Sequence, residues 1–99
     1  MAQAQETLEA EIVREMAAAL GRAEDKVNAA LLRLEVAGAA LAGAADPDAR
    51  RVWAREFNVR RDHALLARWE LLIQRESVGL RRNDVLDELY PIPPRVREV

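Results

Sequence analysis

Apolar residues between positions 13 and 41 recur every three or four residues, the spacing at which side chains share one face of an α-helix. The series comprises Val13, Met16, Leu20, Ala23, Val27, Ala30, Leu34, Ala37 and Leu41. It is an unbroken heptad pattern in which alanine fills every second position after Met16. Because small side chains let two helix axes approach closely, this pattern predicts a long helix over about 6–43, packed against an antiparallel partner helix.

The start of this helix is expected near Gln5 or Glu6, or with Thr7 as the N-cap, so that acidic side chains fall in the first turns. Gly21 costs about 1 kcal/mol relative to alanine in a helix interior. Neither proline nor a capping residue follows it. One continuous helix to about Gly43 is therefore favoured over a break at Gly21.

A helix boundary is marked most clearly at Asp46, which is followed by Pro47 and a second aspartate. An aspartate N-cap with proline at the first helical position is typical of a helix start, and Gly43 suits the C′ position of the preceding helix. The second helix is predicted over about 47–78, with Gly79 as its stop. A loop this short returns the second helix antiparallel to the first, as an αα-hairpin.

The second helix carries two apolar stripes. The first stripe contains Val52, Val59, Leu66 and Ile73, and is widened by Leu65, Trp69 and Leu72. The second stripe contains Trp53, Phe57, Ala64, Ala67, Leu71 and Val78. A helix with two apolar faces needs two partners, and its hairpin mate covers only one of them.

The C-terminal region is predicted to hold a short third helix over about 84–90, capped by Asn83. The run from Pro91 to Pro94 excludes helix and favours an extended tail over 91–99. Ile92 and Val96 are the apolar residues expected to hold this tail against the helices.

The composition excludes most kinds of catalytic and metal site. The chain has no cysteine and a single histidine, so thiolate zinc sites, cysteine nucleophiles and histidine clusters are absent. Arg60 stands three residues before His63, where a di-iron bundle would have glutamate. Trp53, Phe57 and Trp69 fall at helical spacing, as packing residues do. We expect no catalytic, cofactor-binding or metal-binding residues, no cofactor and no enzymatic activity.

Charge is distributed unevenly along the chain. Residues 1–45 carry four basic and seven acidic groups, residues 46–82 nine arginines and six acids, and residues 83–99 two arginines and four acids. Four arginines recur at intervals of seven, at Arg61, Arg68, Arg75 and Arg82. They could bind nucleic acid or another anion. Because the chain has a pI near 5.4 and acids lie among the arginines, ion pairing between an acidic first helix and a basic second helix is the favoured interpretation.

No targeting or membrane segment is expected. The N-terminus lacks the basic and apolar regions of a signal peptide. The most apolar stretch, from Ala29 to Ala42, contains Arg33 and Glu35 and is shorter than the roughly 20 apolar residues of a bilayer span. A cytoplasmic location is expected, with no membrane partner.

The last third of the chain contains the runs Gln74-Arg75-Glu76 and Gly79-Leu80-Arg81, followed by Tyr90-Pro91-Ile92-Pro93. These runs, together with Leu20-Gly21-Arg22-Ala23, resemble a family of short bacterial helical proteins classed as a domain of unknown function. The resemblance implies a bacterial source and an all-helical fold, and it transfers no activity, ligand or site residue. A composition of fourteen arginines and one lysine also suits a GC-rich bacterium.

Together these patterns predict one all-α domain, a helical hairpin with a short third helix and a proline-rich tail. The expected function is that of a structural or interaction module that self-associates. Another protein is a further candidate partner, whereas nucleic acid is a disfavoured one. A nucleic-acid- or anion-binding regulator is the alternative. The uncovered face of the second helix predicts a homodimer that forms a four-helix bundle. The competing outcome is that the third helix and the tail cover this face within one chain.

Overall fold

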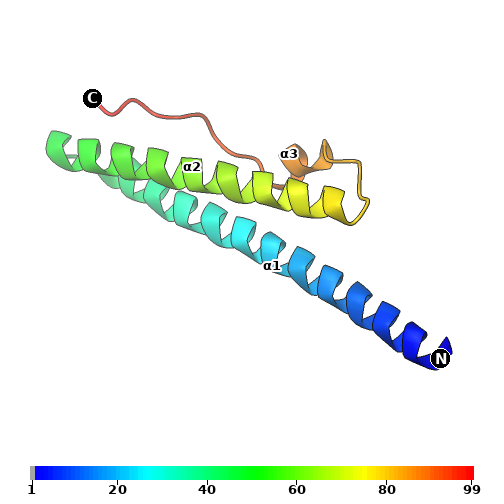
Figure 1. Cartoon of the computed structure of the whole chain (residues 1–99). Coiled ribbons are helices and arrows are strands. Elements are labelled where there is room, and N and C mark those ends of the chain that lie inside the picture. Colours follow the sequence, from blue (N-terminus) through cyan, green and yellow to red (C-terminus); the bar gives the residue numbers. More distant parts are fainter. Residues whose placement is uncertain (1) are drawn as a thin grey trace.

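The computed structural model describes residues 2–99, and their side chains from residue 4 onward. It contains three helices: α1 (Ala2–Gly43), α2 (Pro47–Ser77) and α3 (Val85–Leu89), and the described residues form no strand. Figure 1 shows α1 and α2 as an antiparallel hairpin, with α3 and an extended C-terminal segment beside α2. The molecule is elongated, with extents of 69 × 21 × 14 Å.

The hairpin core forms where the heptad pattern of α1 meets the second stripe of α2. The buried residues of α1 are Val27, Ala30, Leu34, Ala37 and Leu41, and those of the second stripe are Phe57, Ala64, Ala67 and Leu71. Buried alanines on both helices allow the close approach that the sequence predicts. The pattern is half-buried at Leu20 and Ala23 and exposed at Val13 and Met16.

α1 is continuous through Gly21 and ends at Gly43, as expected, but it begins earlier than predicted. It begins at Ala2, four residues before the predicted start, so Thr7 lies inside the helix and the first turn holds no acidic residue. Gly43 is the last residue of α1, and its φ is not positive. Gly43 was expected at the C′ position just beyond the helix, and this expectation was wrong because Gly43 is itself part of α1.

Both ends of α2 are fixed by local hydrogen bonds. The Asp46 carboxylate accepts from the Ala49 backbone N–H at 3.0 Å, which confirms Asp46 as the N-cap. At the other end the Gly79 N–H donates to Glu76 and the Leu80 N–H to Arg75. This is a Schellman arrangement, and Gly79 has the positive φ of 88° that it requires.

The expected role of Asn83 as the cap of α3 was wrong. Asp84 precedes the helix and makes no side-chain cap bond. The Asn83 side chain instead accepts from Arg75 at 3.1 Å, because the connector after Gly79 turns back toward α2. Of α3, Leu86 alone is buried.

The register of the hairpin leaves part of α1 without a partner helix. Gly38 lies against the Phe57 ring, and Lys26 pairs with Glu70 at 3.0 Å. In an antiparallel pair these two contacts place Ser77, the end of α2, opposite residue 18 or 19 of α1. Residues 2–17 therefore project beyond α2 as a helical arm, visible in Figure 1 as the blue end of α1. Every side chain from residue 4 to 18 is exposed, which explains why Val13 and Met16 are not part of the core.

Candidate interaction surfaces

The C-terminal segment, residues 83–99, is held along α2 by arginines spaced seven residues apart. Arg61 Nε donates to the Pro93 carbonyl at 2.8 Å, Arg68 to the Tyr90 carbonyl at 3.0 Å, and Arg75 to the Arg82 carbonyl at 3.1 Å. A heptad places all three on one side of α2, so their guanidinium groups follow the returning chain. We call residues 83–99 the strap.

This arrangement corrects two sequence interpretations of the arginine series. Arg82 lies in the connector outside α2, and only its carbonyl takes part in the contact with Arg75. Among the described residues, Arg61, Arg68 and Arg75 form no ion pair with an acid of α1, because their side chains contact the strap and the Arg82 carbonyl instead. In the described part of the chain, α1 and α2 are joined by the ion pair Lys26–Glu70, in which α1 provides the cation.

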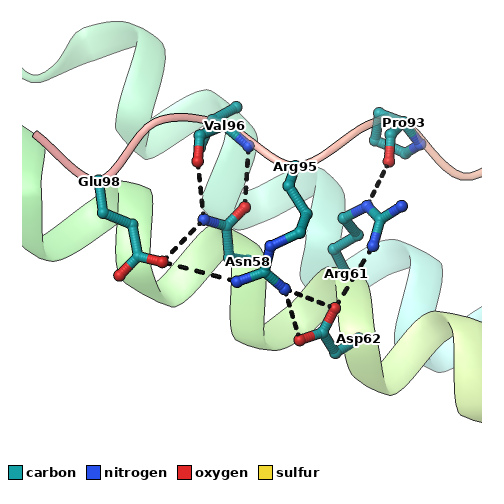
Figure 2. Close-up of polar contacts among 7 residues, drawn as sticks. All are labelled: Asn58, Arg61, Asp62, Pro93, Arg95, Val96 and Glu98. Atoms are coloured by element: carbon teal, nitrogen blue, oxygen red, sulfur yellow. Dashed lines mark hydrogen bonds and ion pairs between the residues drawn. The ribbon is translucent and has the colours of Figure 1, made fainter.

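The strap is hydrogen-bonded to Asn58 of α2, as Figure 2 shows. The Asn58 side-chain amide accepts from the Val96 N–H at 2.9 Å and donates to the Val96 carbonyl at 2.8 Å. It also donates to the Glu98 carboxylate at 3.1 Å. Asn58 is only 2 % exposed, so these bonds satisfy a polar group that would otherwise be buried without a partner.

A second polar contact lies one turn along α2. Arg95 of the strap donates to both carboxylate oxygens of Asp62, at 3.0 and 2.8 Å. These hydrogen bonds, with the charges of Arg95 and Arg61, hold the pKa of the Asp62 carboxyl below its usual value. The ionised form of Asp62 therefore stabilises the docked strap.

The strap covers the side of the hairpin between the two stripes rather than the first stripe. Tyr90, Ile92 and Val96 pack against the core. The heptad residues of the first stripe stay exposed, with Val52 66 % and Leu66 56 % accessible, whereas Leu65 and Leu72 on its flank are half-buried. Trp69, which widens it, is 59 % exposed. The competing outcome was that the third helix and the tail cover, within one chain, the apolar face that α1 leaves free. The strap covers only one flank of that face.

A groove lies between α1 and α2 near the hairpin loop. It is separate from a second groove, which is lined by Pro91 and Pro93 of the strap together with Phe57, and the two share no lining residue. The first groove is the larger of the two, and no part of the strap lines it. Its volume is about 490 Å³. Its lining combines the apolar residues Leu32, Val36, Ala37, Val52 and Trp53 with the charged residues Arg33, Glu56 and Arg60. Leu32 and Val36, which no sequence argument singled out, are 61 % and 60 % exposed. We call this feature the open groove.

In the described part of the chain, no group of three or more His, Asp or Glu side chains could hold a metal ion. His63 is exposed on α2 and lines a shallow hollow with Lys26 and Glu70. No helix among the described residues is long and apolar enough to span a bilayer.

Asn58 and its strap contacts were missed by the sequence analysis. Asn58 lies 38 residues from Val96, and nothing in the local sequence indicates that the chain returns to it. Comparison with known proteins gives no match among protein-family models, curated proteins or solved structures.

Proposed function

We propose that this chain is a structural interaction module that acts as a homodimer and carries no chemistry of its own. The observation that supports this proposal is its exposed surface of 7239 Å². A compact protein of 11.1 kDa exposes roughly 5,700 Å². The excess is larger than the roughly 800 Å² that each partner of a standard interface buries.

The character of the excess surface also favours association. It includes large apolar side chains on the arm, on the open groove and along the first stripe of α2. Soluble monomers rarely expose contiguous apolar patches above a few hundred Å². A second copy supplies surfaces of the same kind, so that one twofold interface covers apolar patches on both chains at once.

The contacts of the arginine series favour this function over the anion-binding alternative. Arg61 and Arg68 are committed to backbone carbonyls of the strap, and Arg75 is committed to the Arg82 carbonyl and the Asn83 side chain. Arg61 and Arg68 side chains are also only 20 % and 22 % exposed. A phosphate ligand would have to displace the strap to reach them.

Light scattering and sedimentation over a range of micromolar concentrations test the proposal. We expect a mass twice the 11.1 kDa of one chain. We also expect a melting temperature that rises with protein concentration, because association stabilises the folded state by mass action. A mass of one chain at all concentrations, with a constant melting temperature, would contradict the proposal. Salt-dependent binding to duplex DNA would instead favour the regulator.

A further inference from the structure

The arm has an apolar face that its own chain cannot cover. Leu8, Ile12 and Met16 follow each other at intervals of four and are 57 %, 50 % and 38 % exposed. Because α1 is one continuous helix from Ala2 to Gly43, the arm cannot fold back onto its own hairpin. Only another molecule can bury this face, and Figure 1 shows the arm standing clear of α2, α3 and the strap.

We infer that, in the proposed homodimer, the arm of each copy lies in the open groove of the other. This inference rests on the proposed self-association and names its contact. An amphipathic helix in an apolar groove between two helices is a common mode of recognition. Leu8, Ile12 and Met16 would pack against Leu32, Val36, Val52 and Trp53, so that each half of the dimer becomes a three-helix bundle.

The charges of the two surfaces are complementary. Residues 2–17 contain four glutamates and one arginine. The charged residues that line the open groove are Arg33, Glu56 and Arg60, and because Glu56 and Arg60 pair with each other, Arg33 gives the groove a net positive charge. Within the groove, Arg33 has no ion pair or hydrogen bond with any described residue. Arm-to-arm pairing would instead bring two strongly acidic helices together, which disfavours that alternative.

The dimensions of the two surfaces also match. The arm has 16 residues and a length of about 24 Å, and residues 47–61 of α2 extend over about 22 Å. Ile12 and Arg33 are 21 residues apart, or three heptads, and lie within about 60° of each other around α1 at a drift of about 20° per heptad. The apolar groove residues Val36 and Leu32 lie further round the helix, about 120° and 160° from Ile12 at about 100° per residue. In a twofold dimer with antiparallel α1 helices, the two contacts form together, because the spacing from arm to groove is identical in both copies.

Two full-length variants test the arm. L8Q/I12Q places glutamine on its apolar face, and A10Q/A17Q places glutamine on the opposite face of the same helix. All four side chains are exposed, so neither variant disturbs the hairpin core. Sedimentation should show dimerisation weakened about a hundredfold or more in L8Q/I12Q, and unchanged in A10Q/A17Q.

The groove is tested with V36Q/V52Q and with the fluorescence of Trp53 in a W69F background. V36Q/V52Q should also be monomeric. Mixing it with L8Q/I12Q should restore a dimer, because an intact arm then meets an intact groove. Trp53 emission should shift to shorter wavelength as the unmodified arm binds and should not shift in L8Q/I12Q.

The outcomes separate this inference from the proposed function. A wild-type chain that is monomeric overturns both. A wild-type dimer that persists in L8Q/I12Q, with the same Trp53 emission, leaves self-association standing and overturns the arm-in-groove contact. A dimer lost in L8Q/I12Q but retained in V36Q/V52Q shows arm-to-arm pairing and also overturns it.

Discussion

The side-chain amide of Asn58 is bonded to both backbone polar groups of Val96, accepting from its N–H and donating to its carbonyl. A strand neighbour would form the same pair of bonds in a β-sheet. Here one buried helix residue supplies both partners, and thereby fixes the position of an extended segment that has no regular hydrogen-bonding structure of its own. The docked strap depends on Asn58 more than on any of its exposed ion pairs.

Replacing Asn58 with alanine should lower the free energy of unfolding by about 1–3 kcal/mol, since two backbone groups lose a partner that is shielded from water. Urea unfolding at fixed protein concentration measures the loss. Asn28→Ala on the exposed side of α1 is the matched control, and it should be neutral or slightly stabilising because alanine has the higher helix propensity. Equal effects of the two substitutions would mean that the strap bonds add no stability.

The stability contributed by Asp62 should depend on pH. Its pKa in the folded protein is below the usual value of about 3.9 in an unfolded chain. The unfolded state therefore binds the proton more readily, and the contribution of Asp62 is present at neutral pH and is lost as the pH falls below about 4. Asp62→Asn should be less stable than wild type at pH 7, and this difference should shrink as the pH falls below about 4.

Arg95→Gln provides the control for the Asp62 prediction, because it removes the donor of both short hydrogen bonds. In that background, Asp62→Asn should have a smaller effect, with a weaker dependence on pH. Unfolding curves at several pH values for the four proteins of this cycle give the coupling directly. A pH-independent coupling would show that the carboxylate of Asp62 is not the group responsible.

The two long helices could be predicted from sequence because their cause is local and repetitive. The alternation of alanine with larger residues from Leu20 to Leu41 identifies the face of α1 that packs, and Asp46 and Gly79 identify the ends of α2. The length of the arm could not be derived in this way. The length depends on where α1 begins, and no residue of a capping type near Ala2 marks that position in the sequence.

The roles of the polar residues were harder to predict, because their partners are distant in the chain. Arg61, Arg68 and Arg75 form a regular series that suits an ion-paired helix face as well as a backbone clamp. Only the path of the strap distinguishes the two. Asn83 has the residue type of an N-cap, yet it lies within reach of Arg75, and the charge-assisted hydrogen bond is the stronger contact.

The cap at Asp46 gives a test that separates capping from charge. Asp46→Ala should destabilise the chain by about 1 kcal/mol because the Ala49 N–H loses its acceptor. Asp46→Asn should retain most of the stability, since an asparagine oxygen accepts the same bond without a charge. Thermal unfolding followed by circular dichroism measures both variants. An Asn variant as unstable as the Ala variant would mean that attraction between the carboxylate and the helix N-terminus is the larger effect.

Gly21 and Gly79 should respond to alanine in opposite directions, because one lies in ordinary helix and the other in left-handed backbone. A Cβ at Gly21 would meet no atom within 4 Å, and α1 runs through this position without a break. Gly21→Ala should therefore stabilise the chain by up to about 1 kcal/mol through higher helix propensity and a less flexible unfolded state.

A Cβ at Gly79 also meets no atom within 4 Å, but the φ of 88° at Gly79 disfavours any side chain, so Gly79→Ala should cost about 1–2 kcal/mol of stability. The pair is informative because steric room is equal at the two sites and only the backbone conformation differs. Chemical denaturation of both variants at one protein concentration measures the two signs. A destabilised Gly21→Ala would reveal a close contact at Gly21 that a single chain does not contain, such as a second copy of α1 packed across it.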